Sequence, residues 1–320
     1  MVGRKNTLTK MTASNENDEN PELTSSRETT QYIQNFNAPV GAVLNDGQSQ
    51  AFVNQSSSTN GSRAQSDDIT VDSVKLLVTR FLSVYENHGI RAHQIPKFAV
   101  DFNVKPSDFA THYSVLNILT DEFISWTCET FGVEKSWMDG DPDWFCKETK
   151  QIYADFDLYK SLYFATDLFE NYKKLPRRDV CLYAFKNGSL TRDTQNKSIV
   201  ALVFQERIGE INGRFIYKYK PVTTHWQWDY YKMRYQIKGI FLLCLKNNIR
   251  TRGFDLSGDV IDQLVAGEIF PELIIQNCYR CSWFPEDYVS TKQESHVAQE
   301  SEELARVVFD LKEDGYAEFF

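Results

Sequence analysis

The stretch from residue 119 to residue 140 (LTDEFISWTCETFGVEKSWMDG) constrains the fold of this 320-residue chain more than any other. Thr120 stands where a helix N-cap is expected, and apolar residues follow it at helical spacing. Gly132 suits a left-handed C-cap, so this helix is predicted to end there. A second short helix is predicted over 134–138 and is closed by Gly140. Two short helices with defined ends therefore follow each other directly.

Three further helices are predicted upstream of this stretch. Apolar residues recur at positions i, i+3, i+4, i+7, i+8 and i+11 from Val74 to Tyr85, which indicates an amphipathic helix of about four turns. A second short helix is predicted over 93–98, and a third over 105–113, with a proline at its first position. Phe109 and Tyr113 would form the buried side of the third helix. Residues 69–141 are therefore predicted to be an all-α domain of four or five short helices.

The predicted helix, the tripeptide Phe131-Gly132-Val133 and the short helix containing Trp137 resemble the closing helices of the lambda-repressor-like (Cro/C1, XRE) helix-turn-helix domain. The resemblance covers residues 69–141, and no family is recognised for 142–320. In that family the third helix enters the DNA major groove, and dimers bind two half-sites. The resemblance implies a bacterial DNA-binding transcriptional regulator that forms a homodimer. It assigns DNA contacts to Gln94, Lys105, Ser107, Thr111 and His112.

The charge of the chain opens a second interpretation. The formal net charge is −9, whereas non-specific DNA affinity comes mainly from cations that neutralise phosphates. Residues 71–141 contain six Lys and Arg side chains against ten Asp and Glu. Asp108 lies within the predicted third helix, and the acidic-basic-glycine run that follows this helix in the family is missing. The alternative is a protein–protein adaptor of a mobile element, in which the acidic helices bind a protein.

Of the two segments that flank the helical domain, one is predicted to be disordered and the other helical. Residues 1–68 are rich in Asn, Ser, Thr, Gln and Glu and show no sustained period, which predicts a disordered tail. Residues 142–179 carry densely spaced aromatic residues and predict a helical connector.

No apolar run approaches the roughly 18 residues of a membrane helix, and the six scattered cysteines favour reduced thiols. We therefore expect a cytoplasmic protein that does not contact a membrane.

Residues 180–320 are predicted to form an α+β domain of antiparallel strands with a long helix. Strands are expected over 180–185, 198–207 and 214–222, and Asn212-Gly213 is a strong hairpin signal between the last two. A long helix is predicted from Trp226 to Cys244 because apolar residues recur at helical spacing. A shorter helix over 259–265, a strand over 271–276 and an acidic helix over 300–310 are expected to follow.

The densest cluster of aromatic and polar residues lies at the predicted start of the long helix, and we expect it to bind a small-molecule effector. Its residues are His225, Trp226, Trp228, Asp229 and Tyr230. Free backbone N–H groups beside stacking rings suit an anionic or planar ligand. His225 and Asp229, four residues apart, also suit an acid–base pair, so an enzyme of unknown type is a further alternative. The simplest alternative is a helix cap whose Trp side chains fill the core.

Two other patterns carry weaker signals. Basic residues cluster at 173–178, 218–220 and 250–252, where they suit either phosphate contacts or a solvated surface. Cys278 and Cys281 form a lone CxxC pair without two further ligands at zinc spacing, which favours ordinary thiols. The common nucleotide-binding, metalloprotease and hydrolase motifs do not occur. The sequence therefore predicts no cofactor, no metal and no catalytic residue.

Overall fold

The computed structural model describes residues 65–140, 151–153, 166–192, 195, 197–222, 225–290 and 298–320. These residues belong to one compact unit, Gly61–Phe320. The predicted tail lies outside the described residues except for 65–68, which already belong to the first helix. Within this unit, the boundary between a helical domain and an α+β domain stays a prediction.

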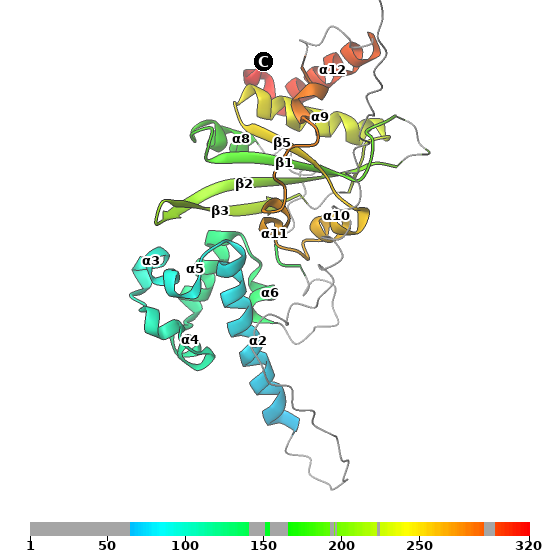
Figure 1. Cartoon of the computed structure of the whole chain (residues 1–320). Helices are drawn as coiled ribbons and strands as arrows, with labels where there is room; N and C mark the ends of the chain where they lie inside the picture. The colour runs from blue at the N-terminus through cyan, green and yellow to red at the C-terminus, as the bar shows by residue number, and fades with distance from the viewer. Residues whose placement is uncertain are drawn as a thin grey trace, which may run out of the picture. The chain divides into compact units, whose positions relative to one another are not determined.

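One long helix and a series of short helices make up the first part of the unit (Figure 1). They are α2 (Gln65–Asn87), η2 (Ala92–Gln94), α3 (Ile95–Phe98), η3 (Val100–Phe102), η4 (Pro106–Phe109), α4 (His112–Ile118), α5 (Asp121–Phe131) and α6 (Lys135–Asp139). The caps of α5 are those that the sequence predicts: Thr120 Oγ1 accepts a 3.2 Å hydrogen bond from Phe123 N, and Gly132 has a φ of 72°. Gly140, with a φ of 69°, ends α6 in the same way.

The third predicted helix differs from the structure. Instead of one helix over 105–113, the chain forms the 3-10 turn η4 and then α4, because Thr111 is extended and acts as the N-cap of α4. The break rotates α4 relative to η4, so Val115 is buried and Tyr113 is 74% exposed. The expected buried position of Tyr113 was therefore wrong, whereas Phe109 is buried as predicted.

The second part of the unit is a mixed sheet. Its strands are β1 (Val180–Lys186), β2 (Ile199–Ile211), β3 (Arg214–Pro221), β4 (Trp226–Gln227) and β5 (Arg250–Asp255). The order is β3-β2-β1-β5, with β4 paired to β2. The first three strands are antiparallel as predicted, and Asn212 and Gly213 form the β2–β3 turn with positive φ angles. However, β5 was not predicted, and it is parallel to β1, so the sheet is not purely antiparallel.

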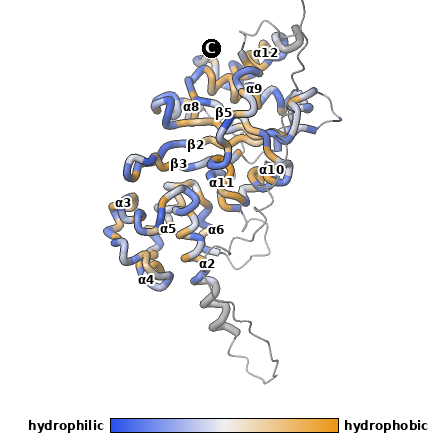
Figure 2. Tube along the Cα trace, in the orientation of Figure 1, coloured by the Kyte–Doolittle hydropathy of each residue, from blue (hydrophilic) through white to orange (hydrophobic). Residues whose placement is uncertain are grey.

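Helices cover both faces of the sheet (Figure 1). One face packs against α9 (Tyr231–Lys246) and α8 (Thr166–Lys173), and α12 (Ala298–Leu311) lies on α9. The other face packs against α10 (Gly258–Val265), α11 (Pro271–Ile275) and the helices of the first part. Apolar segments gather on the sheet and on the helix sides that face it (Figure 2). The short helices η6 (Pro285–Tyr288), η7 (Lys312–Tyr316) and η8 (Ala317–Phe319) complete the described elements.

The first helices and the sheet share one hydrophobic core. The His88 ring, at the end of α2, lies 4.5 Å from Phe131, 5.7 Å from Tyr219 and 5.9 Å from Phe270, measured between ring centroids. Gly209 allows the close approach of Phe98, because a Cβ at this position would lie 2.8 Å from Phe98 Cε2. These contacts hold α2, α3 and α5 against β2 and β3.

One further prediction of secondary structure was wrong. Residues 271–276 are not a strand; Pro271 occupies the first turn of α11, where its missing N–H is tolerated. Most of the predicted helical connector (142–150 and 154–165) lies outside the described residues. In its described parts, Tyr153 forms an antiparallel bridge with Val133, and α8 is helical as expected. None of the helices in the described ranges is long and apolar enough to cross a membrane.

Candidate functional site

Most of the predicted DNA-binding residues lie on one exposed segment, 105–113. Lys105, Ser107, Thr111 and His112 are all exposed there, on η4 and at the start of α4. Gln94 lies at the end of η2, which contacts η4. The structure therefore brings the five residues into one region, although not onto a single helix.

Local hydrogen bonds fix the two turns of this segment. Lys105 N donates to Asp108 Oδ2 at 2.8 Å, and Ser114 N donates to Thr111 Oγ1 at 3.1 Å. The Gln94 side chain is also engaged locally, since its Oε1 accepts a 3.0 Å bond from Arg91 N. The side chains of Lys105 and His112 have no hydrogen-bond partner among the described residues and are available to a ligand.

The surroundings of this segment are acidic. Asp101, Asp108 and Glu122 line a concave region of about 400 Å³ that also includes Phe102 and Ile118. A phosphate group would be repelled by these carboxylates, whereas a cationic side chain would be attracted to them. Part of the excess of Asp and Glu in residues 71–141 therefore lies beside the proposed DNA contacts.

The cluster at 225–230 is arranged differently from its prediction. The long helix begins at Tyr231 rather than at Trp226, because Trp226 and Gln227 form strand β4 against β2. Trp226 is wholly buried and Trp228 is 2% exposed, so both indoles pack in the core. Only Tyr230 and His225 are exposed members of the cluster.

The predicted pairing of His225 with Asp229 is also corrected. His225 Nε2 lies 3.3 Å from Asp262 Oδ1 of α10, and both side chains are more than half exposed. Asp229 Oδ1 is buried and has no hydrogen-bond partner among the described residues. Four-residue spacing would pair the two side chains only on a continuous helix, and β4 interrupts that helix.

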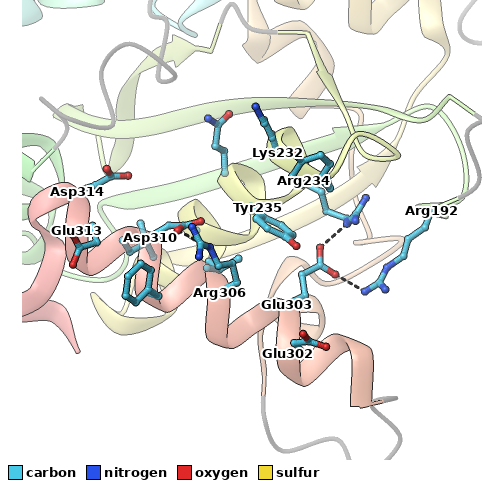
Figure 3. A pocket seen from close by; sticks show the side chains of 16 residues that line it. Arg192, Lys232, Arg234, Tyr235, Glu302, Glu303, Arg306, Asp310, Glu313 and Asp314 are labelled. Carbon is cyan, nitrogen blue, oxygen red and sulfur yellow. Dashed lines mark hydrogen bonds and ion pairs between the residues drawn. The ribbon is translucent and has the colours of Figure 1, made fainter.

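A pocket of about 920 Å³ lies next to this cluster, between the first turns of α9 and the helix α12 (Figure 3). Glu303 of α12 is 5% exposed and accepts a 2.6 Å hydrogen bond from Arg234 Nε of α9. Arg192, from the β1–β2 loop, donates to the other Glu303 oxygen, and Lys238 Nζ lies 3.3 Å from it. Sequence reasoning missed this site, because its partners are about 70 and 110 residues apart.

The pocket is connected to the predicted effector cluster through Arg234. Its Nη1 donates to the backbone oxygens of Trp228, at 2.7 Å, and Asp229, at 3.1 Å. Tyr231 and Tyr235 line the same pocket with their rings 5.8 Å apart. The cavity therefore offers aromatic faces, cations and carboxylates to a ligand, one helical turn beyond the residues that the sequence indicated.

The five cysteines in the described residues are all free thiols. Cys278 and Cys281 are not joined in a disulfide, and burial raises the pKa of Cys278 to about 11. In the part of the chain that the structure describes, no three His, Cys, Asp or Glu side chains are placed to hold a metal ion.

Comparison with protein-family models, with curated proteins and with solved structures finds no match for this chain.

Proposed function

We propose that this protein is a DNA-binding regulator that contacts DNA through residues 105–113 and binds an effector between α9 and α12. The observation that carries DNA binding is the exposure of Lys105, Ser107, Thr111 and His112 on a segment whose turns are fixed by local hydrogen bonds to Asp108 and Thr111. Phe109 and Val115 anchor this segment in the core. Side chains held on such a scaffold meet a partner with little loss of conformational entropy.

The residue types on this segment suit a nucleic acid. Lysine and hydroxyl groups bind phosphate oxygens, while histidine and tyrosine reach base edges or stack on unpaired bases. Tyr113, which was expected to be buried, adds an exposed ring beside His112. We propose that the protein acts as a homodimer, since helix-turn-helix regulators commonly bind two half-sites.

The effector site is proposed from the second part of the unit. The α9–α12 pocket combines a buried ion-pair network with two tyrosine rings, a combination that suits a polar, partly planar small molecule. A ligand bound there would contact α12 and α9 at once. Its binding would therefore change how α12 packs on the rest of the unit.

The test of DNA binding uses the full chain and a pool of genomic DNA fragments at two salt concentrations. We expect discrete fragments to be enriched and their retention to weaken with salt. The double variant Lys105→Ala/His112→Ala should lose this enrichment, whereas Lys312→Ala, an exposed lysine after α12, should retain it. No enrichment by the unsubstituted chain at low salt would refute DNA binding, and enrichment by the double variant would refute the assignment of residues 105–113.

A second candidate function is docking of a cationic protein on the acidic helices. The carboxylates of Asp101, Asp108 and Glu122, which line one concave region, favour it. In this case the Asp101→Asn/Glu122→Gln variant would lose a protein partner in a pull-down. DNA enrichment would be absent for the unsubstituted chain.

A further inference from the structure

The turn between α8 and β1 is the most basic exposed segment of the described chain. Residues 173–178 (KKLPRR) are all exposed, and four of the six are cations. Lys174 and Arg177 have no ion-pair partner among the described residues, while Arg178 Nε lies 3.7 Å from Asp179 Oδ1. Free cations in a short turn bind polyanions without first breaking an ion pair.

Contacts connect this turn to the β2–β3 hairpin. The Arg178 guanidinium lies 5.7 Å from the centre of the Phe215 ring, and that of Arg207 lies 3.8 Å from it. Phe215 follows Arg214, the first residue of β3 after the hairpin turn. The hairpin end of β2 and β3 and the end of α8 are both hydrophilic (Figure 2).

The hairpin is connected in turn to the first helices. Lys97 Nζ of α3 donates to Asn212 Oδ1 at 3.3 Å, and Arg214 Nη1 donates to Gly89 O at 3.3 Å. The α8 helix, the hairpin end and α3 follow one another along one side of the unit (Figure 1). We call this surface the basic edge and define it by the cations Lys97, Lys173, Lys174, Arg177, Arg178, Arg207 and Arg214.

The charge of the basic edge is opposite to that of the rest of the chain. Four of its seven cations form ion pairs with Glu170, Asp179, Glu210 and Glu272, whereas the chain carries a net charge of −9. Residues 71–141 have an excess of acids, so they supply few phosphate contacts of their own. A DNA-binding protein must obtain these contacts elsewhere, because phosphate neutralisation provides most of the non-specific affinity.

We propose that the basic edge binds the phosphate backbone of DNA next to the contacts made by residues 105–113. This inference rests on the proposed DNA-binding function. It assigns the electrostatic part of the DNA affinity to the turn 173–178 and the hairpin. The edge begins at Lys97 in α3, whose N-cap is the proposed DNA contact Gln94, and the turn η2 that ends at Gln94 contacts η4. One duplex can therefore extend from that segment onto the edge.

The test measures the affinity of the full chain for a mixed-sequence DNA duplex over a series of salt concentrations. The variant Lys174→Gln/Arg177→Gln removes two exposed cations that have no ion-pair partner, so the fold should be unaffected. Because each phosphate contact contributes about 0.9 to the slope of log K against log salt, we expect the slope to decrease by about 1.8. The control Arg280→Gln/Lys312→Gln removes two exposed cations outside the edge that form no ion pair with any described residue, and it should keep the original slope.

The outcomes separate this inference from the function on which it rests. Binding of DNA by both variants with the slope of the unsubstituted chain would overturn the basic edge and leave DNA binding standing. Equal slope losses in the edge variant and the control would also overturn it, because only total charge would then matter. Failure of the unsubstituted chain to bind the duplex at low salt would overturn the DNA-binding function itself, and the edge with it.

Discussion

Arg234 of α9 and Glu303 of α12 form a buried ion pair in which Arg234 Nε donates to Glu303 Oε1 at 2.6 Å. The same arginine donates to the backbone oxygens of Trp228 and Asp229. One side chain therefore connects α12, α9 and the segment that follows β4. The α9–α12 pocket is built around this connection.

Replacement of Glu303 by Gln should destabilise the protein strongly. The substitution keeps the shape of the side chain but leaves the buried Arg234 guanidinium without its carboxylate, which typically costs about 3–5 kcal/mol. Urea unfolding followed by circular dichroism measures the free energy. Glu302→Gln, at the exposed neighbouring position, should change it by less than about 0.5 kcal/mol. Equal effects of the two substitutions would show that the buried network does not hold α12 on α9.

Stability should fall on acidification because of His88. Burial lowers the pKa of His88 to about 4, while an unfolded histidine titrates near 6.5. The unfolded state therefore binds one more proton between these values, so the contribution is complete above about pH 6.5 and decreases as the pH falls towards 4. The expected loss is about 3 kcal/mol in the free energy of unfolding.

The pH effect is assigned by comparing variants. His88→Leu should lose the part of the pH dependence between 4 and 6.5, whereas His112→Gln, at an exposed histidine, should retain it. Chemical unfolding at half-unit pH intervals provides the comparison. An unchanged profile in His88→Leu would mean that this histidine is not buried in its neutral form.

Gly253 should tolerate no side chain. A Cβ at this position in β5 would lie 2.5 Å from both the backbone oxygen and Cδ2 of Trp283. Overpacking of this kind typically costs about 1–3 kcal/mol, and the Gly253→Ala variant should show it in thermal or urea unfolding. Gly188→Ala is the matched control, since its Cβ would meet only Ser198 Oγ at 3.6 Å. A Gly253→Ala protein as stable as the control would contradict the contact between β5 and Trp283.

Cys278 should react slowly with alkylating reagents at neutral pH. Its pKa is raised to about 11 by burial, and only the thiolate is nucleophilic. The rate of iodoacetamide labelling should therefore rise about tenfold for each pH unit above neutrality. Peptide-resolved mass spectrometry of the intact, folded protein measures this rate. Rapid labelling at pH 7 would instead indicate an activated cysteine and a redox role for the CxxC pair.

Local signals in the sequence predicted the ends of α5 and α6 and the main hairpin correctly. The N-cap Thr120, the C-cap Gly132 and the turn Asn212-Gly213 act through backbone geometry within a few residues of themselves. Such features do not depend on the rest of the chain. For the same reason the strands that flank the hairpin were found close to their observed positions.

The errors occurred where distant contacts decide the structure. Trp226 has a helical apolar spacing, yet it pairs with Val200 in β4, because the sheet provides hydrogen-bond partners that the sequence does not reveal. The β5 strand was not predicted because its residues are mostly polar. Its partner β1 also lies far away in the sequence, and the connection between the two parallel strands includes α9.

The sequence by itself determined the caps of α5, the β2–β3 hairpin and the excess of acids, because these depend on residue type and short-range geometry. The tertiary structure alone decided which charges meet. It placed Glu303 on Arg234, paired His225 with Asp262 rather than Asp229, and brought the turn at 173–178 beside the β2–β3 hairpin. Ion pairs and pockets form between side chains far apart in the chain, so only the folded backbone brings them together.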